Sequence, residues 1–217
     1  MVVFNFFRLS GDLIHVASIF LLLKKIIGRK NCAGISLKTQ ILYATVFTSR
    51  YLDIFTNTYS PYNTILKIVY LVSTYYTIYL IARTYKTTYD AEHDSFNPFY
   101  LIVPSAIIGF AISADHTSIS EVLWTFSIVL ESVAILPQIF LLQKTGAVEN
   151  ITADYIVCLG TYRALYIMNW VYRYITEPGY SAWTVWIFGS IQTLMYADFF
   201  YFYAKSRIKG EELVLPA

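Results

Sequence analysis

Two stretches of this sequence place charged and aromatic side chains at helical spacing among otherwise apolar residues. Arg8, Asp12 and His15 follow one another at i, i+4 and i+7, so one face of a helix carries all three. A second helical face, within the stretch 162–173, carries Tyr162, Tyr166, Asn169, Trp170 and Arg173. Guanidinium groups bind carboxylates bidentately. The chemistry that we expect from this pattern is non-covalent recognition of an anion.

Two further apolar stretches carry charged residues that could reach the same place. Arg50 and Asp53 lie three residues apart. The other stretch has polar and aromatic residues at i, i+3 and i+10, namely Glu121, Trp124 and Glu131. Because a helix rises ~1.5 Å per residue, these groups converge on one half of their helices, and Glu131 could meet Tyr162 near the midplane. Ionisable residues inside membrane helices face a bundle interior or a water-filled cavity. We therefore predict a wet, cationic pocket walled by these helices.

Intramembrane charges also commonly pair with one another, so the arginines could simply hold helices together. The acids available for such pairing are Asp12, Asp53, Glu121, Glu131, Asp154 and Asp198. Ion pairing is the favoured interpretation for Arg163, which adjoins Tyr162 and is predicted to point to a different face. Anion recognition is the favoured interpretation for Arg8, Arg50 and Arg173.

The aromatic residues and the histidine on these faces also have two interpretations. Trp124 and Trp170 could be packing residues, or they could cover the stem or the cation of a ligand. His15 alone would be a satisfied polar residue in a bundle. Beside Arg8 and Asp12, however, it becomes a candidate proton switch.

The composition narrows the class of protein. The chain has 217 residues, of which 57% are hydrophobic and only 14% charged, whereas about a quarter of the residues of a soluble domain are charged. The net charge of +2 does not suggest a nucleic-acid partner. Cys32 and Cys158 have no metal-binding spacing and form no disulfide framework. No catalytic motif or phosphate loop emerges, so we expect neither an enzyme nor a metal or cofactor site.

Seven apolar runs are long enough to cross a bilayer, which takes ~20 residues per helix. They lie at 4–23, 38–57, 64–82, 96–113, 120–142, 152–175 and 181–204. Alternate connections and the tail hold most of the 16 basic residues: Lys24, Lys25, Arg29, Lys30, Lys38, Arg83, Lys86, Lys144, Lys205, Arg207 and Lys209. The positive-inside rule then places the N-terminus outside or in a lumen and the tail in the cytosol. Lys67, near a span end, is interpreted as snorkelling to the interface.

The expected fold class is therefore an all-α membrane protein with seven transmembrane helices in a lipid bilayer. The first three and the last three spans could form two parallel three-helix repeats joined by the fourth, an established transporter arrangement. We expect residues 1–217 to form a single domain, with a short cytosolic tail from about residue 205.

The sequence resembles the KDEL/HDEL receptors, also called endoplasmic reticulum (ER) lumen protein-retaining receptors. The matching text is FRLSGD (7–12), CAGIS (32–36), RYLD (50–53), LWTFS (123–127), LESVAILPQ (130–138), YRALY (162–166), NW (169–170) and DFFY (198–201). This resemblance covers essentially the whole chain. Pro137 and Gln138 also link it to the PQ-loop and SWEET-like transporter architecture.

The resemblance implies a function that suits the predicted pocket. Such receptors bind the C-terminal four-residue signal of escaped ER residents in the mildly acidic Golgi. They return that cargo in COPI vesicles and release it at the more neutral pH of the ER. The signal offers an Asp, a Glu and a free carboxylate, which are three anions for three arginines. A SWEET-like transporter of small solutes is the alternative, but arginines facing one compartment would bind anions and stall it.

The resemblance also implies roles for individual residues. Arg50, with help from Tyr51, takes the terminal carboxylate, while Arg8 and Arg173 take the acidic side chains. The residues that face the Lys or His at the start of the signal are Asp53 and Glu121, with Trp124 or Trp170. Two further residues on the face that holds Arg173 complete the ligand-binding set, Tyr166 and Asn169.

In this resemblance, His15 is the pH-sensing residue, Glu131 and Tyr162 form a latch below it, and Asp198 relays the conformational change. An anionic ligand favours the charged form of a histidine, so affinity is gained in acid and lost near neutrality.

The tail departs from the family pattern, because Glu211, Glu212 and Val214 stand where relatives often have lysines and a phosphorylatable serine. We therefore expect COPI recruitment by the upstream basic cluster Lys205, Arg207 and Lys209, and no phosphorylation of the tail at this position.

Overall fold

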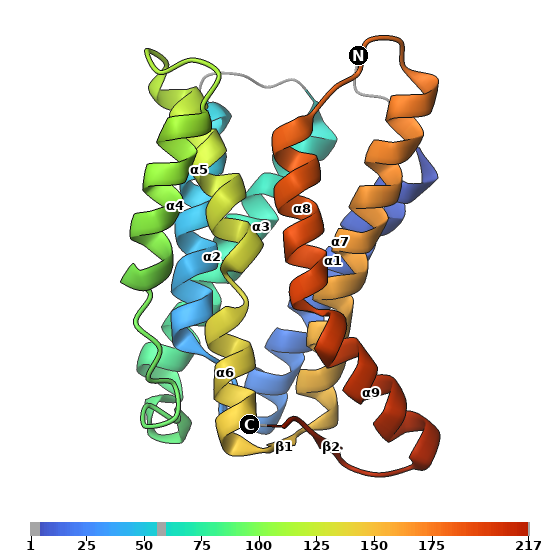
Figure 1. The fold of residues 1–217 in the computed structure, drawn as a ribbon. Coiled ribbons are helices and arrows are strands. Elements are labelled where there is room, and N and C mark those ends of the chain that lie inside the picture. Colours follow the sequence, from blue (N-terminus) through green and yellow to red (C-terminus); the bar gives the residue numbers. More distant parts are fainter. Residues whose placement is uncertain (1–4, 56–59, 217) are drawn as a thin grey trace. The chain divides into compact units, whose positions relative to one another are not determined.

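The computed structural model describes residues 5–55 and 60–216, and these are almost entirely helical (Figure 1). The α-helices are α1 (Phe6–Arg29), α2 (Leu37–Arg50), α3 (Pro61–Tyr79), α4 (Phe99–Ile112), α5 (Ile119–Val133), α6 (Leu136–Thr145), α7 (Asn150–Thr176), α8 (Trp183–Met195) and α9 (Ala197–Lys209). Short helical turns are η1 (Leu52–Phe55), η2 (Leu80–Thr84) and η3 (Lys86–Thr88). The two strands are β1 (Ala147–Val148) and β2 (Leu213–Val214).

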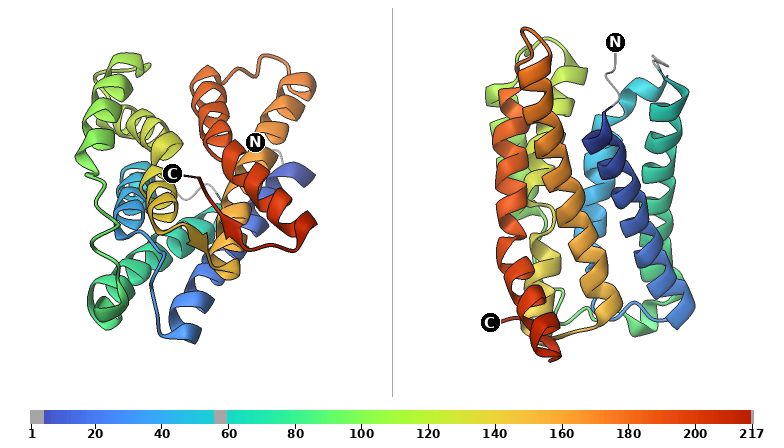
Figure 2. Two further views of the ribbon diagram at one scale, coloured as in Figure 1. Left: turned by 60° about the horizontal axis from the view of Figure 1, so that its bottom comes forward. Right: turned by 90° about the vertical axis from the view of Figure 1, so that its right-hand side faces the viewer.

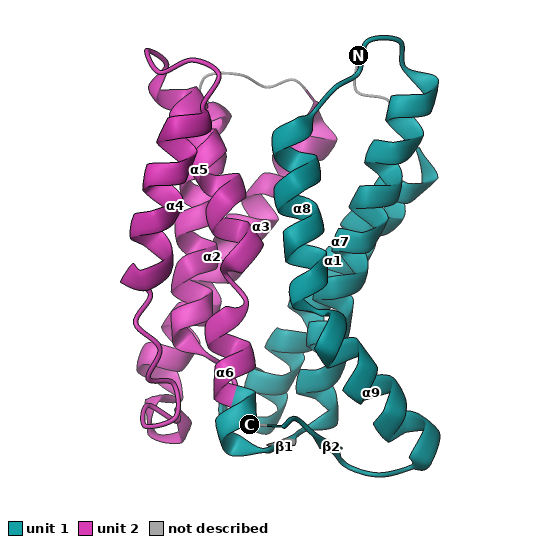
Figure 3. Cartoon of the chain, in the orientation of Figure 1, with its two compact units in different colours: residues 1–34, 142–217 teal, residues 35–141 magenta. Residues whose placement is uncertain are grey.

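The chain forms two compact units, coloured separately in Figure 3. Unit 1 comprises residues 1–34 and 142–217, and unit 2 comprises residues 35–141. In unit 1, α1 packs along α7, α7 contacts α8, and α8 contacts α9 (Figure 2). In unit 2, α2 packs between α3 and α5, and α5 also contacts α4. The three-helix repeats and the single seven-helix domain stay predictions.

Local sequence signals explain where several helices begin. Asn5 caps α1 because its side chain accepts a hydrogen bond from the backbone N–H of Arg8 at 2.9 Å. Ser36 and Ser118 cap α2 and α5 in the same way. Pro61 occupies the first turn of α3, where its missing N–H has no helical partner to lose.

Two expected spans are interrupted. The run 120–142 forms α5 and α6, which are separated just before Pro137, a residue that cannot supply the N–H of a continuous helix. Gln138 secures this break, because its backbone N–H donates to Thr39 Oγ1 at 3.0 Å and its Oε1 accepts from the Ser36 N–H at 2.9 Å. The run 181–204 is likewise divided into α8 and α9 at Tyr196, whose ring is fully buried.

Helices occupy all seven predicted runs, and three helical stretches are long and apolar enough to cross a membrane. Those three are Phe6–Arg29, Pro61–Thr84 and Ile119–Thr145, and a shorter apolar helix covers Phe99–Ile112. The prediction of helical, membrane-type elements is therefore confirmed, while the count of seven crossings and their orientation stay predictions. The expected span ends at residue 4 and residues 56–57 lie outside the described residues.

The end of the first span was predicted incorrectly. Lys24 and Lys25 were expected in a loop, but α1 continues to Arg29. Lys25 is only 2% exposed, and its ammonium group donates to Thr152 Oγ1 at 2.8 Å and pairs with Glu149 at 3.1 Å. These partners stabilise a lysine that burial would otherwise penalise, so it is an internal residue of unit 1 and no part of a basic loop.

The second span and the tail also differ from the prediction. Helix α2 ends at Arg50, and Asp53 lies in η1 instead of on the same helix. At the other end of the chain, α9 continues through the basic cluster to Lys209. The residues beyond it fold back, since β2 pairs antiparallel with β1 and the side chains of Leu213 and Leu215 are buried.

Candidate functional site

The polar face of α1 packs against the aromatic face of α7 within unit 1. The amide of Asn5 donates to the side-chain oxygen of Asn169 at 2.6 Å, and the hydroxyl of Tyr166 donates to a carboxylate oxygen of Asp12. Gly11 permits this approach, because a Cβ at that position would lie 3.0 Å from the Tyr166 ring. The two faces predicted from helical spacing are thus brought together by direct contacts.

His15 and Tyr162 are a buried pair on these two faces. Their rings are stacked, with centroids 4.1 Å apart and planes inclined by 6°. His15 is 8% exposed and Tyr162 is 3% exposed. The stack fixes the orientation of the imidazole between α1 and α7, on the face of α1 that also carries Asp12.

Arg163 does not point to a different face from Tyr162, as its adjacency had suggested. Its guanidinium group donates to the Tyr162 hydroxyl at 3.1 Å and lies 5.1 Å from the centre of that ring. The side chain therefore curls back over its neighbour, and the arginine is held by a hydrogen bond and by an aromatic ring.

Arg8 and Arg173, both in unit 1, have acidic neighbours one helical turn away. Arg8 Nε lies 4.0 Å from Asp12. Arg173 forms two hydrogen bonds of 2.8 Å with Glu177, and its guanidinium lies 4.0 Å from the centre of the Tyr180 ring. This hydrogen-bonded pairing lowers the pKa of Glu177 from its usual value. Arg173 thus already binds a carboxylate bidentately, with an aromatic ring over its planar face.

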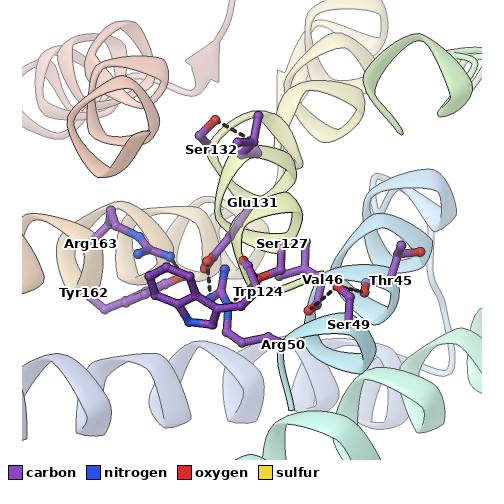
Figure 4. A network of polar contacts seen from close by, with 11 residues as sticks. Thr45, Val46, Ser49, Arg50, Trp124, Ser127, Glu131, Ser132, Tyr162 and Arg163 are labelled. Carbon is purple, nitrogen blue, oxygen red and sulfur yellow. Dashed lines mark hydrogen bonds and ion pairs between the residues drawn. The ribbon is translucent and has the colours of Figure 1, made fainter. Parts of the chain in front are cut away.

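Arg50 makes the corresponding contacts in unit 2. Figure 4 shows its side chain reaching from the end of α2 to α5. There its Nη1 pairs with Glu131 at 2.5 Å and its Nε donates to Ser127 Oγ at 2.9 Å. The Glu131 side chain is 4% exposed. The predicted latch residue is therefore the internal counter-ion of the arginine that was assigned to the terminal carboxylate.

Asp53 and Tyr51, which follow Arg50 along the chain, contact a residue that we had assigned to snorkelling. Lys67, from α3, pairs with Asp53 Oδ2 at 2.5 Å and lies 5.7 Å from the centre of the Tyr51 ring. The Tyr51 ring is itself stacked on Phe47, with centroids 5.7 Å apart. Lys67 therefore belongs to the same cluster as the predicted ligand-binding residues of unit 2.

The remaining predicted residues lie on α5, α7 and α9. Glu121 is in the first turn of α5, and among the residues that the structure describes its carboxylate has no ion pair. Trp124 is 37% exposed, whereas Trp170 is 9% exposed and packs against Gly189, where a Cβ would lie 2.4 Å from the indole ring. Asp198 is exposed in the first turn of α9.

The sequence interpretation missed several partners in these clusters. Glu177 stands four residues after Arg173, a spacing that places two side chains together on a helix, so this signal was available. Ser127 and Tyr180 carried no signal of their own, because serine and tyrosine occur throughout this chain. The partner of Lys67 could not be found from spacing, since the two residues lie on different elements.

The chain is similar to known proteins along nearly its whole length. Residues 31–173 match the family model of the ER lumen protein retaining receptor. Proteins named ER lumen protein-retaining receptor from Entamoeba histolytica and Dictyostelium discoideum are 59% and 54% identical to the chain, and the alignments cover 99% and 98% of it and 100% and 99% of those relatives. ER lumen protein-retaining receptor 2 of Gallus gallus is 51% identical over 98% of the chain and 100% of that relative. The chain therefore belongs to the family of ER lumen protein-retaining receptors.

Proposed function

We propose that this protein binds the C-terminal tetrapeptide signal of ER-resident proteins in the Golgi and returns them to the ER. The names of its relatives describe receptors that retain proteins of the ER lumen. The observation that supports the proposal most strongly is that Arg173 holds a carboxylate in a bidentate fork beneath an aromatic ring. A peptide that ends in acidic residues and a free carboxylate offers the same group.

Binding would proceed by exchange of carboxylates. Each of the three proposed anion-binding arginines has an acid of the same unit beside it: Asp12 for Arg8, Glu131 for Arg50, and Glu177 for Arg173. The signal provides two acidic side chains and a terminal carboxylate. We assign the terminal carboxylate to Arg50 and Tyr51, and the acidic side chains to Arg8 and Arg173. Exchange keeps every guanidinium paired, which avoids the cost of a buried unpaired charge.

The other proposed ligand-binding residues act on the rest of the signal. Asp53 and Glu121 supply negative charge for the Lys or His at its start, with the indole of Trp124 or Trp170 beside it. Tyr166 and Asn169, which are hydrogen-bonded to α1, fix the position of that helix against α7 as well as facing the peptide.

The proposed pH dependence resides in His15. Its protonation adds a positive charge next to an anionic ligand, so binding is tight in the Golgi and weak at the more neutral pH of the ER. Release of Glu131 from Arg50 would free its carboxylate to close a latch with Tyr162. We propose that Asp198, at the start of α9, relays this change to the tail.

The proposed cytosolic end of the receptor recruits the COPI coat. The exposed residues Lys205, Arg207 and Lys209 all lie on α9. Two of them have acidic neighbours, because Arg207 pairs with Asp154 at 3.1 Å and Lys209 lies 3.9 Å from Glu211. Lys205, which lies over the Tyr201 ring, is the member of this cluster with no acid pairing among the described residues.

Titration of the purified receptor with a signal tetrapeptide tests the proposed function. Arg50→Lys keeps a positive charge beside Glu131 but loses the planar fork, so it separates recognition from folding. We expect affinity to fall at least tenfold, which is about 1.4 kcal/mol. Arg83→Lys, in the turn after α3, serves as the matched control and should bind normally. Undiminished affinity in Arg50→Lys would exclude the assigned role.

A further inference from the structure

We propose that Lys67 is an intramolecular competitor for the first residue of the signal, and that it relaxes selection at that position. This inference rests on the proposed function, in which Asp53 faces the cationic residue that opens the tetrapeptide. In the structure, the ammonium of Lys67 already holds that position, 2.5 Å from Asp53 Oδ2.

The surroundings of Lys67 resemble those expected for a bound lysine. Its ammonium group has a carboxylate on one side and the ring of Tyr51 on another, at 5.7 Å from the ring centre. Carboxylate and aromatic face together are the usual features of a site for an organic cation. The tyrosine platform is held in turn by Phe47, which is 4% exposed and also stacks on Tyr70 of α3.

The pair is open enough for exchange. The Lys67 and Asp53 side chains are 21% and 31% exposed, so water and a peptide can reach both. An ion pair of this exposure is weak, and its rupture changes an equilibrium constant by no more than about fivefold. Lys67 can therefore leave Asp53 when a ligand cation arrives, without unfolding the cluster.

The consequence concerns specificity. When a lysine of the signal displaces Lys67, one ammonium replaces another on Asp53, and Asp53 contributes little net preference for a cation. A signal with a neutral first residue leaves the pair of Lys67 and Asp53 intact, so it loses no binding free energy at Asp53. What preference remains comes from Glu121, whose carboxylate has no ion pair within the described part of the chain. The receptor therefore accepts different residues at the first position of the signal, whereas it requires the carboxylates of the residues that follow.

A simple structural role for the pair makes a different prediction. If Lys67 served only to hold η1 against α3, its removal would weaken binding of every signal by the same factor. If it competes with the ligand, its removal changes the ratio of affinities between signals. This ratio is therefore the quantity to measure, and it does not depend on the fraction of folded protein.

The experiment uses two tetrapeptides that differ only in the first residue, Lys or Ala, and the full-length receptor in detergent. For the wild type we expect the Lys peptide to bind within about fivefold of the Ala peptide. Lys67→Met removes the internal cation beside Asp53 and should raise that ratio about three- to fivefold. Lys67→Arg retains the internal cation and should keep the wild-type ratio. The double variant Lys67→Met with Asp53→Asn should lose the gain.

An unchanged ratio in Lys67→Met, with both affinities lowered equally, would overturn the competitor role and leave the proposed function standing. Absence of binding of either peptide to the wild type would overturn the proposed function and this inference together. Lys67→Gln, which retains a polar side chain, repeats the test should the methionine variant fold poorly.

Discussion

The imidazole of His15 lies flat against the phenol ring of Tyr162, with 4.1 Å between centroids and 6° between planes. This stack joins α1 to α7 and puts a titratable ring next to the helical face that carries Arg8 and Asp12. We propose that this stack converts a change of pH into a change in binding.

Replacement of His15 by alanine should flatten the pH dependence of tetrapeptide binding. One linked proton changes affinity by up to about tenfold per pH unit, and we expect this slope between mild acid and neutrality in the wild type and not in the variant. Binding curves at a series of pH values measure the slope. Tyr162→Phe keeps the stacked ring and removes only the hydroxyl of the proposed latch, so it should lower affinity at every pH and retain the histidine slope. Full pH dependence in His15→Ala would show that another group senses the pH.

Replacement of Glu177 by glutamine should increase affinity without altering the pH slope. Arg173 lowers the pKa of Glu177 through their hydrogen bonds. The pair's contribution is present above the unfolded-state pKa and is lost only as pH falls through the lowered folded-state value. Glu177 therefore stays ionised throughout the mildly acidic to neutral range, and its competition for Arg173 is constant there.

We expect Glu177→Gln to bind the signal up to about fivefold more tightly at every pH, because a solvent-accessible ion pair is weak. Glu177→Asp is the control with retained charge. A change in affinity that appeared only in acid would contradict the assignment of pH sensing to His15.

Replacement of Gly189 by alanine should destabilise the receptor. A Cβ at this position would lie 2.4 Å from the Trp170 indole, so the ring or α8 must move. Such overpacking costs about 1–3 kcal/mol, and Trp170 is also a proposed ligand contact. Thermal unfolding in detergent measures the loss. Gly28→Ala, at a helical glycine with no atom within 4 Å of the added carbon, should leave the melting temperature unchanged or slightly raised.

Charge reversal of Lys205 and Lys209 together should prevent return to the ER. Both are exposed on α9, and reversal removes the positive charge that we propose the coat binds. Imaging of the tagged receptor in cells should show accumulation in the Golgi, with signal binding by the purified protein unaffected. Arg83→Glu together with Lys86→Glu, at two exposed residues in η2 and η3, changes the net charge by the same amount and serves as the control. Normal recycling of the double variant would eliminate this cluster as the coat-binding element.

The sequence predicted the helical faces well because helical periodicity fixes which residues share a side. The face of Arg8, Asp12 and His15 and the face that holds Tyr162 and Asn169 are in contact, as their polarity implied. Periodicity cannot show where a helix is interrupted by tertiary contacts. The break before Pro137 is held by Gln138, which binds Ser36 and Thr39 at the start of α2. The continuation of α1 to Arg29 is held by the partners of Lys25, which are Thr152 of α7 and Glu149, the residue just before α7.

Helical periodicity is equally unable to predict ion pairs between different helices. Glu177 was predictable from its spacing to Arg173, whereas the pairing of Arg50 with Glu131 joins residues 81 positions apart and needs the packing of α2 on α5. Lys67 is a further case, because a lysine near a helix end is usually free to reach the interface. Only the position of η1 beside α3 makes Asp53 its partner.

One comparison tests the competition between internal and peptide carboxylates most directly. The wild-type receptor is titrated with the same tetrapeptide as a free acid and as its C-terminal amide, in mild acid and near neutrality. We expect the free acid to bind at least tenfold more tightly than the amide in mild acid, and the affinity of the free acid to fall as the pH rises. Equal binding of acid and amide in mild acid would contradict the recognition of a chain terminus by these arginines.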